Sequence, residues 1–154
     1  MAEKSLWKNR EHVPVVLLRP SIIASSLEGP FPGWTDSLSA AGGLSLMTGL
    51  GLLNWLHAGG KNHFDVIPVD IVSNSIIVAT ANGANVAPIM EIYNSGTSVT
   101  NAIKMEDYVK YLLDALNYHE FNKRALPVHL KLIKNKLEFQ LKRGFWNDLP
   151  FKGM

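Results

Sequence analysis

Residues 13–20 read VPVVLLRP, a short apolar run that is rich in β-branched residues and ends in Arg-Pro. A run without polar alternation is typical of a strand covered on both faces, as in a parallel sheet with helices on each side. Because proline cannot continue the hydrogen bonding of a sheet, Pro20 predicts the end of this strand. The stretch therefore favours an α/β fold.

Strands and helices alternate after this run. Residues 65–69 are predicted as a short strand or a loop and residues 89–93 as a strand, and helices are predicted at 69–80, at 104–118 and after Pro127. Asp70 stands where the N-cap of a helix is expected, and Asn82-Gly83 supplies the end of that helix. The alternation indicates a parallel sheet, although three strands are too few for a complete doubly wound sheet.

The last predicted helix is amphipathic. Its apolar residues at helical spacing are expected to face inward and its lysines outward. The inward set is Leu130, Ile133, Leu137 and Leu141, and the outward set is Lys131, Lys134, Lys136 and Lys142.

The composition excludes several classes of protein. Of 154 residues, 47% are hydrophobic and 18% are charged, so a packed core is expected rather than a disordered chain. A net charge of +2 gives no argument for nucleic-acid binding. There is no cysteine, which excludes a disulfide framework and a thiolate zinc site. No signal peptide is expected, because residues 1–12 lack an apolar segment.

Residues 37–60 carry no charge over 24 positions, which raises the question of a membrane span. Six of the 24 are glycine, and glycine pairs interrupt a continuous helix. We therefore expect a buried or substrate-facing helix near residues 44–56, with a membrane span as the alternative.

Motifs with chemistry are few. The only Gly-x-Gly, at Gly49-Leu50-Gly51, lacks a third glycine because Asn54 stands there, so it is not expected to bind a dinucleotide. No Tyr-x-x-x-Lys is present, and the five histidines lack paired metal-ligand spacing. The sequence thus predicts no catalytic residue and no metal site within this chain.

Five segments in order carry a resemblance to a known family: LLRPSII at 17–23, EGPFPGWTD at 28–36, DVIPVD at 65–70, VSNSIIVA at 72–79 and IYNSG at 92–96. Together they resemble the NAD(P)-binding domain of alcohol-forming fatty acyl-CoA reductases, within the extended short-chain dehydrogenase/reductase superfamily. The resemblance covers about residues 13–107. It implies the C-terminal portion of such a domain, with a partial Rossmann-like parallel sheet at 1–107 and a helical, basic C-terminal segment at 108–154.

The resemblance also implies site residues. The segment after the Arg-Pro strand would line the nicotinamide end of the cofactor NADPH, and it consists of Pro20, Ser21, Ile22 and Ile23. Residues Phe31, Pro32 and Trp34 would form the edge of the acyl-substrate cleft, with plain core or lid packing as the alternative. Asp70 resembles the family's helix cap.

The implied function is that of a fragment of a fatty acyl-CoA reductase, which reduces long-chain acyl-CoA to fatty alcohol with NADPH. The family's glycine fingerprint and catalytic Tyr-x-x-x-Lys precede the Arg-Pro strand, so the isolated chain is expected to be inactive and to bind NADPH weakly. Leu50 and Asn54 stand where the family usually carries basic residues, which argues against a phosphate or CoA contact by this loop. The alternative is a non-catalytic, reductase-like accessory subunit completed by a partner chain.

The resemblance leads to expectations about location. The chain is expected to be intracellular, at a peroxisomal or endoplasmic-reticulum membrane. The basic C-terminal segment is either a solvated face or a peripheral contact with an anionic membrane.

Overall fold

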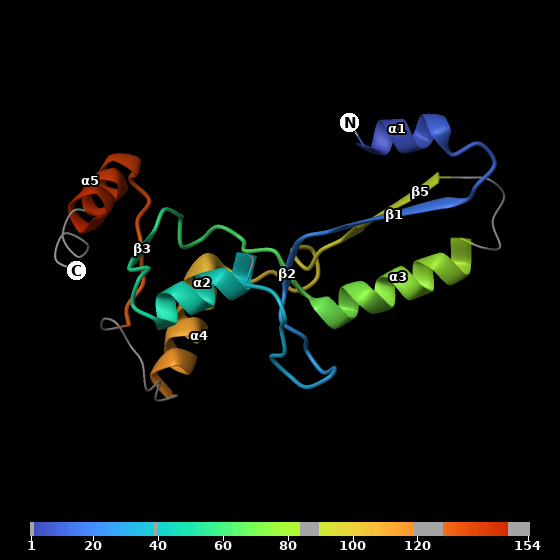
Figure 1. Cartoon of the computed structure of the whole chain (residues 1–154). Helices are drawn as coiled ribbons and strands as arrows, with labels where there is room; N and C mark the ends of the chain where they lie inside the picture. The colour runs from blue at the N-terminus through green and yellow to red at the C-terminus, as the bar shows by residue number, and fades with distance from the viewer. Residues whose placement is uncertain (1, 39, 84–89, 119–127, 148–154) are drawn as a thin grey trace. The chain divides into compact units, whose positions relative to one another are not determined.

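The computed structural model describes residues 2–38, 40–83, 90–118 and 128–147 (Figure 1). The elements are α1 (Ala2–Asn9), β1 (Val15–Pro20), β2 (Ile22–Ala24), α2 (Ala40–Gly49), β3 (Trp55–Leu56), β4 (Val66–Pro68), α3 (Val69–Gly83), β5 (Met90–Ser95), α4 (Met105–Tyr118), β6 (Lys131–Leu132) and α5 (Lys136–Asn147). They form two compact units, one of residues 1–36 and 65–99 and the other of residues 37–64 and 100–154. These units are defined by compactness. The division into a binding domain at 1–107 and a helical segment at 108–154 concerns function, and it stays a prediction.

The first unit is built on a parallel pair of strands. β1 and β5 run side by side, in register from Val15 opposite Met90 to Pro20 opposite Ser95 (Figure 1). Helix α3 packs against β1 so closely that a Cβ added at Gly83 would lie 2.6 Å from Cγ2 of Val16. Within the described residues, β1 and β5 pair only with each other. The predicted α/β fold with parallel strands is confirmed.

A second parallel pair follows directly in the same unit. β2 pairs with β4, and the backbone N–H of Ile22 donates to the carbonyl of Asp65 at 3.1 Å. β2 was not expected, because three residues give too short a pattern to predict a strand. Ile67 of β4 and Val72 of α3 are buried.

The second unit has its own core. Its buried apolar side chains are Ala41, Val109, Leu116, Leu130 and Ile133. β3 and β6 form a short parallel pair, with Trp55 opposite Lys131. The sequence predicted neither strand, since each has two residues.

Helix α2 differs from the helix expected at 44–56. It starts earlier because Gly42 and Gly43 let the chain approach closely: a Cβ there would lie 2.6 and 2.4 Å from the carbonyl oxygens of Ser37 and Leu38. It ends in a Schellman motif, in which Gly51 donates to the Thr48 carbonyl and Leu52 to the Met47 carbonyl, both at 2.9 Å. Gly51 has a φ of 74°, the left-handed conformation that this motif requires.

The segment Gly49-Leu50-Gly51 is thus the end of a helix rather than a phosphate-binding loop. Among the described helices, none has the length and the apolar composition needed to cross a membrane.

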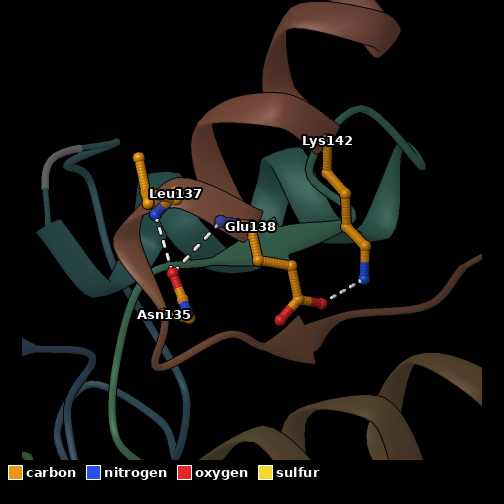
Figure 2. Close-up of polar contacts among 4 residues, drawn as sticks. All are labelled: Asn135, Leu137, Glu138 and Lys142. Carbon is orange, nitrogen blue, oxygen red and sulfur yellow. Dashed lines mark hydrogen bonds and ion pairs between the residues drawn. The ribbon is translucent and has the colours of Figure 1, made fainter.

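The C-terminal helix also differs from the prediction. It begins at Lys136, where Asn135 Oδ1 accepts the backbone N–H of Leu137 at 2.9 Å and that of Glu138 at 3.3 Å (Figure 2). Leu130 and Ile133 are buried as expected. Leu137 and Leu141 were expected to face inward and are instead 70% and 75% exposed. The pattern failed because residues 131–132 form a strand, so the four apolar residues do not share one helix face.

Candidate functional site at the strand ends

The residues expected near the cofactor lie at the carboxyl ends of the strands of the first unit. The backbone N–H of Ser21 donates to the carbonyl of Ser95 at 2.8 Å, so the parallel pairing of β1 with β5 extends one residue beyond Pro20. Pro20 closes β1, and Ile22 and Ile23 continue into β2. Ligands of open α/β sheets bind outside this edge of the sheet. The structure therefore brings the four predicted residues to the edge where a cofactor is expected.

An acidic side chain that the sequence reading did not single out lies in the same place. Asp65 Oδ1 accepts the backbone N–H of Thr97 at 2.8 Å and the Thr97 hydroxyl at 3.1 Å. The Ser98 hydroxyl and this backbone N–H hold the pKa of Asp65 well below its usual range. The carboxylate comes close because residue 96 is glycine, where a Cβ would lie 2.9 Å from Asp65 Oδ2. A signal was present in the sequence: Asp65 precedes one strand, and the Ser-Gly-Thr-Ser turn follows another.

The Ser21 hydroxyl is the unpaired group of this site. Its oxygen is buried and forms no hydrogen bond of ordinary geometry, although it lies near enough to Asp65 to help lower the pKa of that carboxyl. A buried polar atom without a partner is costly and is rare in folded proteins. A ligand with a hydrogen-bonding group would satisfy it, and the carboxamide of a nicotinamide ring is such a group. The chemistry of this position thus fits a nicotinamide cofactor.

The three residues expected at the acyl cleft belong to one closed loop. Ser26 holds both ends of the loop: its N–H donates to the Trp34 carbonyl at 2.9 Å, and its hydroxyl donates to the Phe31 carbonyl at 2.8 Å. The Phe31 side chain is 58% exposed, Pro32 is exposed and Trp34 is half-buried. The loop therefore presents aromatic surface to its surroundings, and contact with an acyl chain stays a prediction.

Asp70 acts differently from the expected helix cap. Its carboxylate accepts only one N–H of its own helix, that of Ile71 at 3.1 Å. The other donors are three consecutive backbone N–H groups of the loop: Leu27 at 3.1 Å to each oxygen, Glu28 at 2.9 Å and Gly29 at 3.3 Å. The N–H groups of Glu28 and Leu27 lower the pKa of Asp70 to about 2. Asp70 thus ties the loop to the start of α3.

A parallel α/β unit with candidate binding residues beyond its strand ends is an arrangement found in nucleotide-binding domains. Comparisons with known proteins agree. Residues 1–76 match the family model described as Male sterility protein, an NAD-binding family. The chain is 35% identical over 103 residues to probable fatty acyl-CoA reductase 5 of Arabidopsis thaliana, which covers 67% of this chain and 21% of the relative.

Two animal relatives match over a longer stretch. Fatty acyl-CoA reductase 1 of Rattus norvegicus is 28% identical over 151 residues, 97% of this chain and 29% of the relative. Its Xenopus laevis counterpart is 28% identical over 138 residues, 89% of this chain and 27% of the relative. The chain belongs to the fatty acyl-CoA reductase family, and it spans less than a third of the length of these relatives.

Proposed function

We propose that this chain supplies the strand-end part of the active site of a reductase that converts long-chain acyl-CoA to fatty alcohol with NADPH. The observation that carries the proposal is the buried Ser21 hydroxyl, which forms no hydrogen bond of ordinary geometry within the described residues and lies beside Asp65 at the carboxyl ends of β1 and β5. The relatives, named as fatty acyl-CoA reductases, support the substrate class. The family model supports a nicotinamide cofactor, and NADPH rather than NADH is part of the proposal.

Each residue has a task in this proposal. When bound, the cofactor supplies the hydride, and Ser21 hydrogen-bonds the nicotinamide carboxamide. Ile22 and Ile23 offer apolar surface to the ring, and Ile23 is 40% exposed, hence accessible. Pro20 ends β1 so that this segment turns across the sheet edge.

The loop at 26–34 would bind the acyl chain. Phe31, Pro32 and Trp34 offer aromatic and apolar area, and burying each CH₂ of an alkyl chain contributes about 0.8 kcal/mol. The proton donor of the proposed reaction is not in this chain, which has no Tyr-x-x-x-Lys. Turnover therefore needs residues beyond these 154, and the isolated chain should be inactive.

A chimera tests the proposal. This chain replaces the matching segment of the Rattus norvegicus relative, and alcohol formation is measured with a long-chain acyl-CoA and NADPH. We expect NADPH-dependent alcohol formation, a higher KM for NADPH in Ser21→Ala, and no change in Ser5→Ala, an exposed serine on α1. A folded chimera without NADPH-dependent turnover would contradict the proposal.

The second candidate function is a non-catalytic, reductase-like subunit completed by a partner chain. It is favoured by β1, which within the described residues pairs on one edge only, with β5. An exposed strand edge is a template for pairing with another chain. Isolation of the chain in a complex, together with an inactive folded chimera, would favour this candidate over the reductase.

We further propose that the C-terminal segment contacts an anionic membrane, at the peroxisome or the endoplasmic reticulum. Leu137 and Leu141 lie four residues apart on α5, both are exposed, and Lys134 and Lys136 precede them. Co-sedimentation with anionic vesicles and not with neutral ones is expected, and Leu137→Ser with Leu141→Ser should abolish it. Equal binding to neutral vesicles would contradict the role of charge.

A further inference from the structure

A groove of about 440 Å³ lies in the first unit, along one side of α3 and the neighbouring part of β5. Ile71, Asn74, Val78 and Asn82 line it from one face of the helix, and Tyr93 and Ser95 line it from the strand. Its volume is in the range of small-molecule sites. The residues proposed above to bind the cofactor and the acyl chain do not line this groove, so the groove has no role in the proposed function.

The lining of the groove is neutral and amphipathic. None of the described residues that line it is charged. Asn74, Asn82 and Asn94 contribute carboxamides, and their side chains have no hydrogen-bond partner among the described residues. Ile71 and Val78 are 41% and 59% exposed, so their apolar surface is accessible. A ligand that fits alternates amide groups with short apolar segments and carries no charge along its length.

The length of the groove further restricts the ligands that can fit it. From Ile71 to Asn82 the helix rises by eleven residues, which is about 16 Å. The pantetheine arm of coenzyme A has two amides, a gem-dimethyl group and two ethylene segments. Its chain from sulfur to terminal oxygen has about as many bonds as four residues of extended backbone, or about 14 Å. The arm and the groove therefore match in length as well as in polarity.

One end of the groove meets the proposed reaction site. Ser95 lines the groove, and its carbonyl accepts the N–H of Ser21, a proposed cofactor residue. Ile71, at the start of α3, follows Asp70, which holds the loop that carries Phe31 and Trp34. A ligand in the groove thus ends beside both proposed sites.

We propose that this groove binds the pantetheine arm of acyl-CoA, with the thioester at the Ser95 end. The inference rests on the proposed function, because it assigns a further part of the same substrate. The asparagine carboxamides hydrogen-bond the two amides of the arm, and Ile71 and Val78 pack against its methyl groups. Since no charge takes part, this binding is insensitive to salt.

Titration of the whole 154-residue chain with reduced pantetheine tests the inference. Pantetheine lacks the nucleotide and the acyl chain, so it reports on the groove alone. We expect saturable changes in the NMR signals of the side-chain amides of Asn74, Asn82 and Asn94, unchanged by added salt. Asn74→Ala should weaken binding about three- to tenfold, as expected for one lost neutral hydrogen bond. Asn101→Ala is the matched control, since Asn101 is exposed and does not line the groove.

A second variant fills the groove. Ala79 lines it, and Ala79→Trp should abolish pantetheine binding while thermal unfolding stays cooperative. Should that variant fail to fold, Asn82→Trp near the helix end is the second filling variant. No saturable change with pantetheine, or changes that persist in the filled variant, would overturn the inference. So would selective binding of an unrelated amide-rich peptide, because the groove would then be a peptide site.

The chimera separates the two proposals. If it makes alcohol while Ala79→Trp leaves its KM for acyl-CoA unchanged, the groove inference fails and the reductase proposal stands. If the isolated chain binds pantetheine while the folded chimera is inactive, the reductase proposal fails and the groove remains a pantetheine site.

Discussion

The carboxylate of Asp70 accepts the backbone N–H of Glu28 at 2.9 Å, a contact between residues 42 positions apart in the chain. The neighbouring N–H groups of Leu27 and Gly29 converge on the same carboxylate. Without the carboxylate, these three N–H groups would have to hydrogen-bond to water instead. The first helical turn of α3 therefore fixes the loop that carries Phe31 and Trp34.

Replacing this carboxylate should loosen the loop. In Asp70→Asn the charge is lost and the amide offers only one oxygen to three donors. We expect faster hydrogen exchange at the amides of Leu27, Glu28 and Gly29 and a lower midpoint of thermal unfolding. Asp36→Asn is the control, because Asp36 is an exposed aspartate away from these N–H groups. Equal exchange rates in the two variants would show that Asp70 does not hold the loop.

Acid should destabilise the first unit through the same group. The pKa of Asp70 is lowered in the folded chain from 3.8 to about 2, so the unfolded chain takes up the proton first as the pH falls. The stability that Asp70 contributes is therefore complete above pH 3.8 and is lost as the pH falls toward 2. Asp65 acts in the same direction, since its pKa is also lowered. Urea midpoints measured from pH 6 to pH 2 should fall across this interval, and less steeply in Asp70→Asn; parallel curves would contradict the assignment.

The sequence predicted the elements with long, regular patterns. β1, α3 and α4 were found near their expected positions, because a buried strand and an amphipathic helix each impose a period on the chain. The same reasoning placed Pro20 to Ile23 at a strand end. Such patterns are local, and they predict the main strand and helix of the first unit.

What the sequence did not predict depends on contacts between distant segments. Asp70 was expected to cap its own helix, and only the folded chain shows the loop at 27–29 against it. The early start of α2 depends on the carbonyl groups that approach Gly42 and Gly43. The bond between Asp65 and Thr97 joins residues 32 positions apart, and although each lies next to a strand, their local patterns do not show that they pair. Tertiary contacts of this kind override local preference.

The close approach of α3 and β1 should not tolerate a methyl group. In Gly83→Ala the new Cβ would lie 2.6 Å from Val16 Cγ2, and valine is stiff at χ1. We expect overpacking to cost about 1–3 kcal/mol of unfolding free energy. In the double variant with Val16→Ala the added methyl group has room, so the two effects should be less than additive. Strict additivity in urea unfolding would show that the two residues do not meet.

The core of the second unit should be sensitive to truncation at Leu116. This side chain is 9% exposed, and its Cδ2 lies 3.1 Å from the position of a Cβ at Gly49, so α4 and α2 meet closely there. Truncation in Leu116→Ala removes buried methyl groups and leaves a cavity, which should cost about 2–5 kcal/mol. Leu137→Ala, at a leucine that is 70% exposed, should change stability by less than about 0.5 kcal/mol. Both values follow from urea unfolding at neutral pH; a similar cost for the two variants would mean that α5 is covered in solution and that Leu137 is not free to meet a membrane.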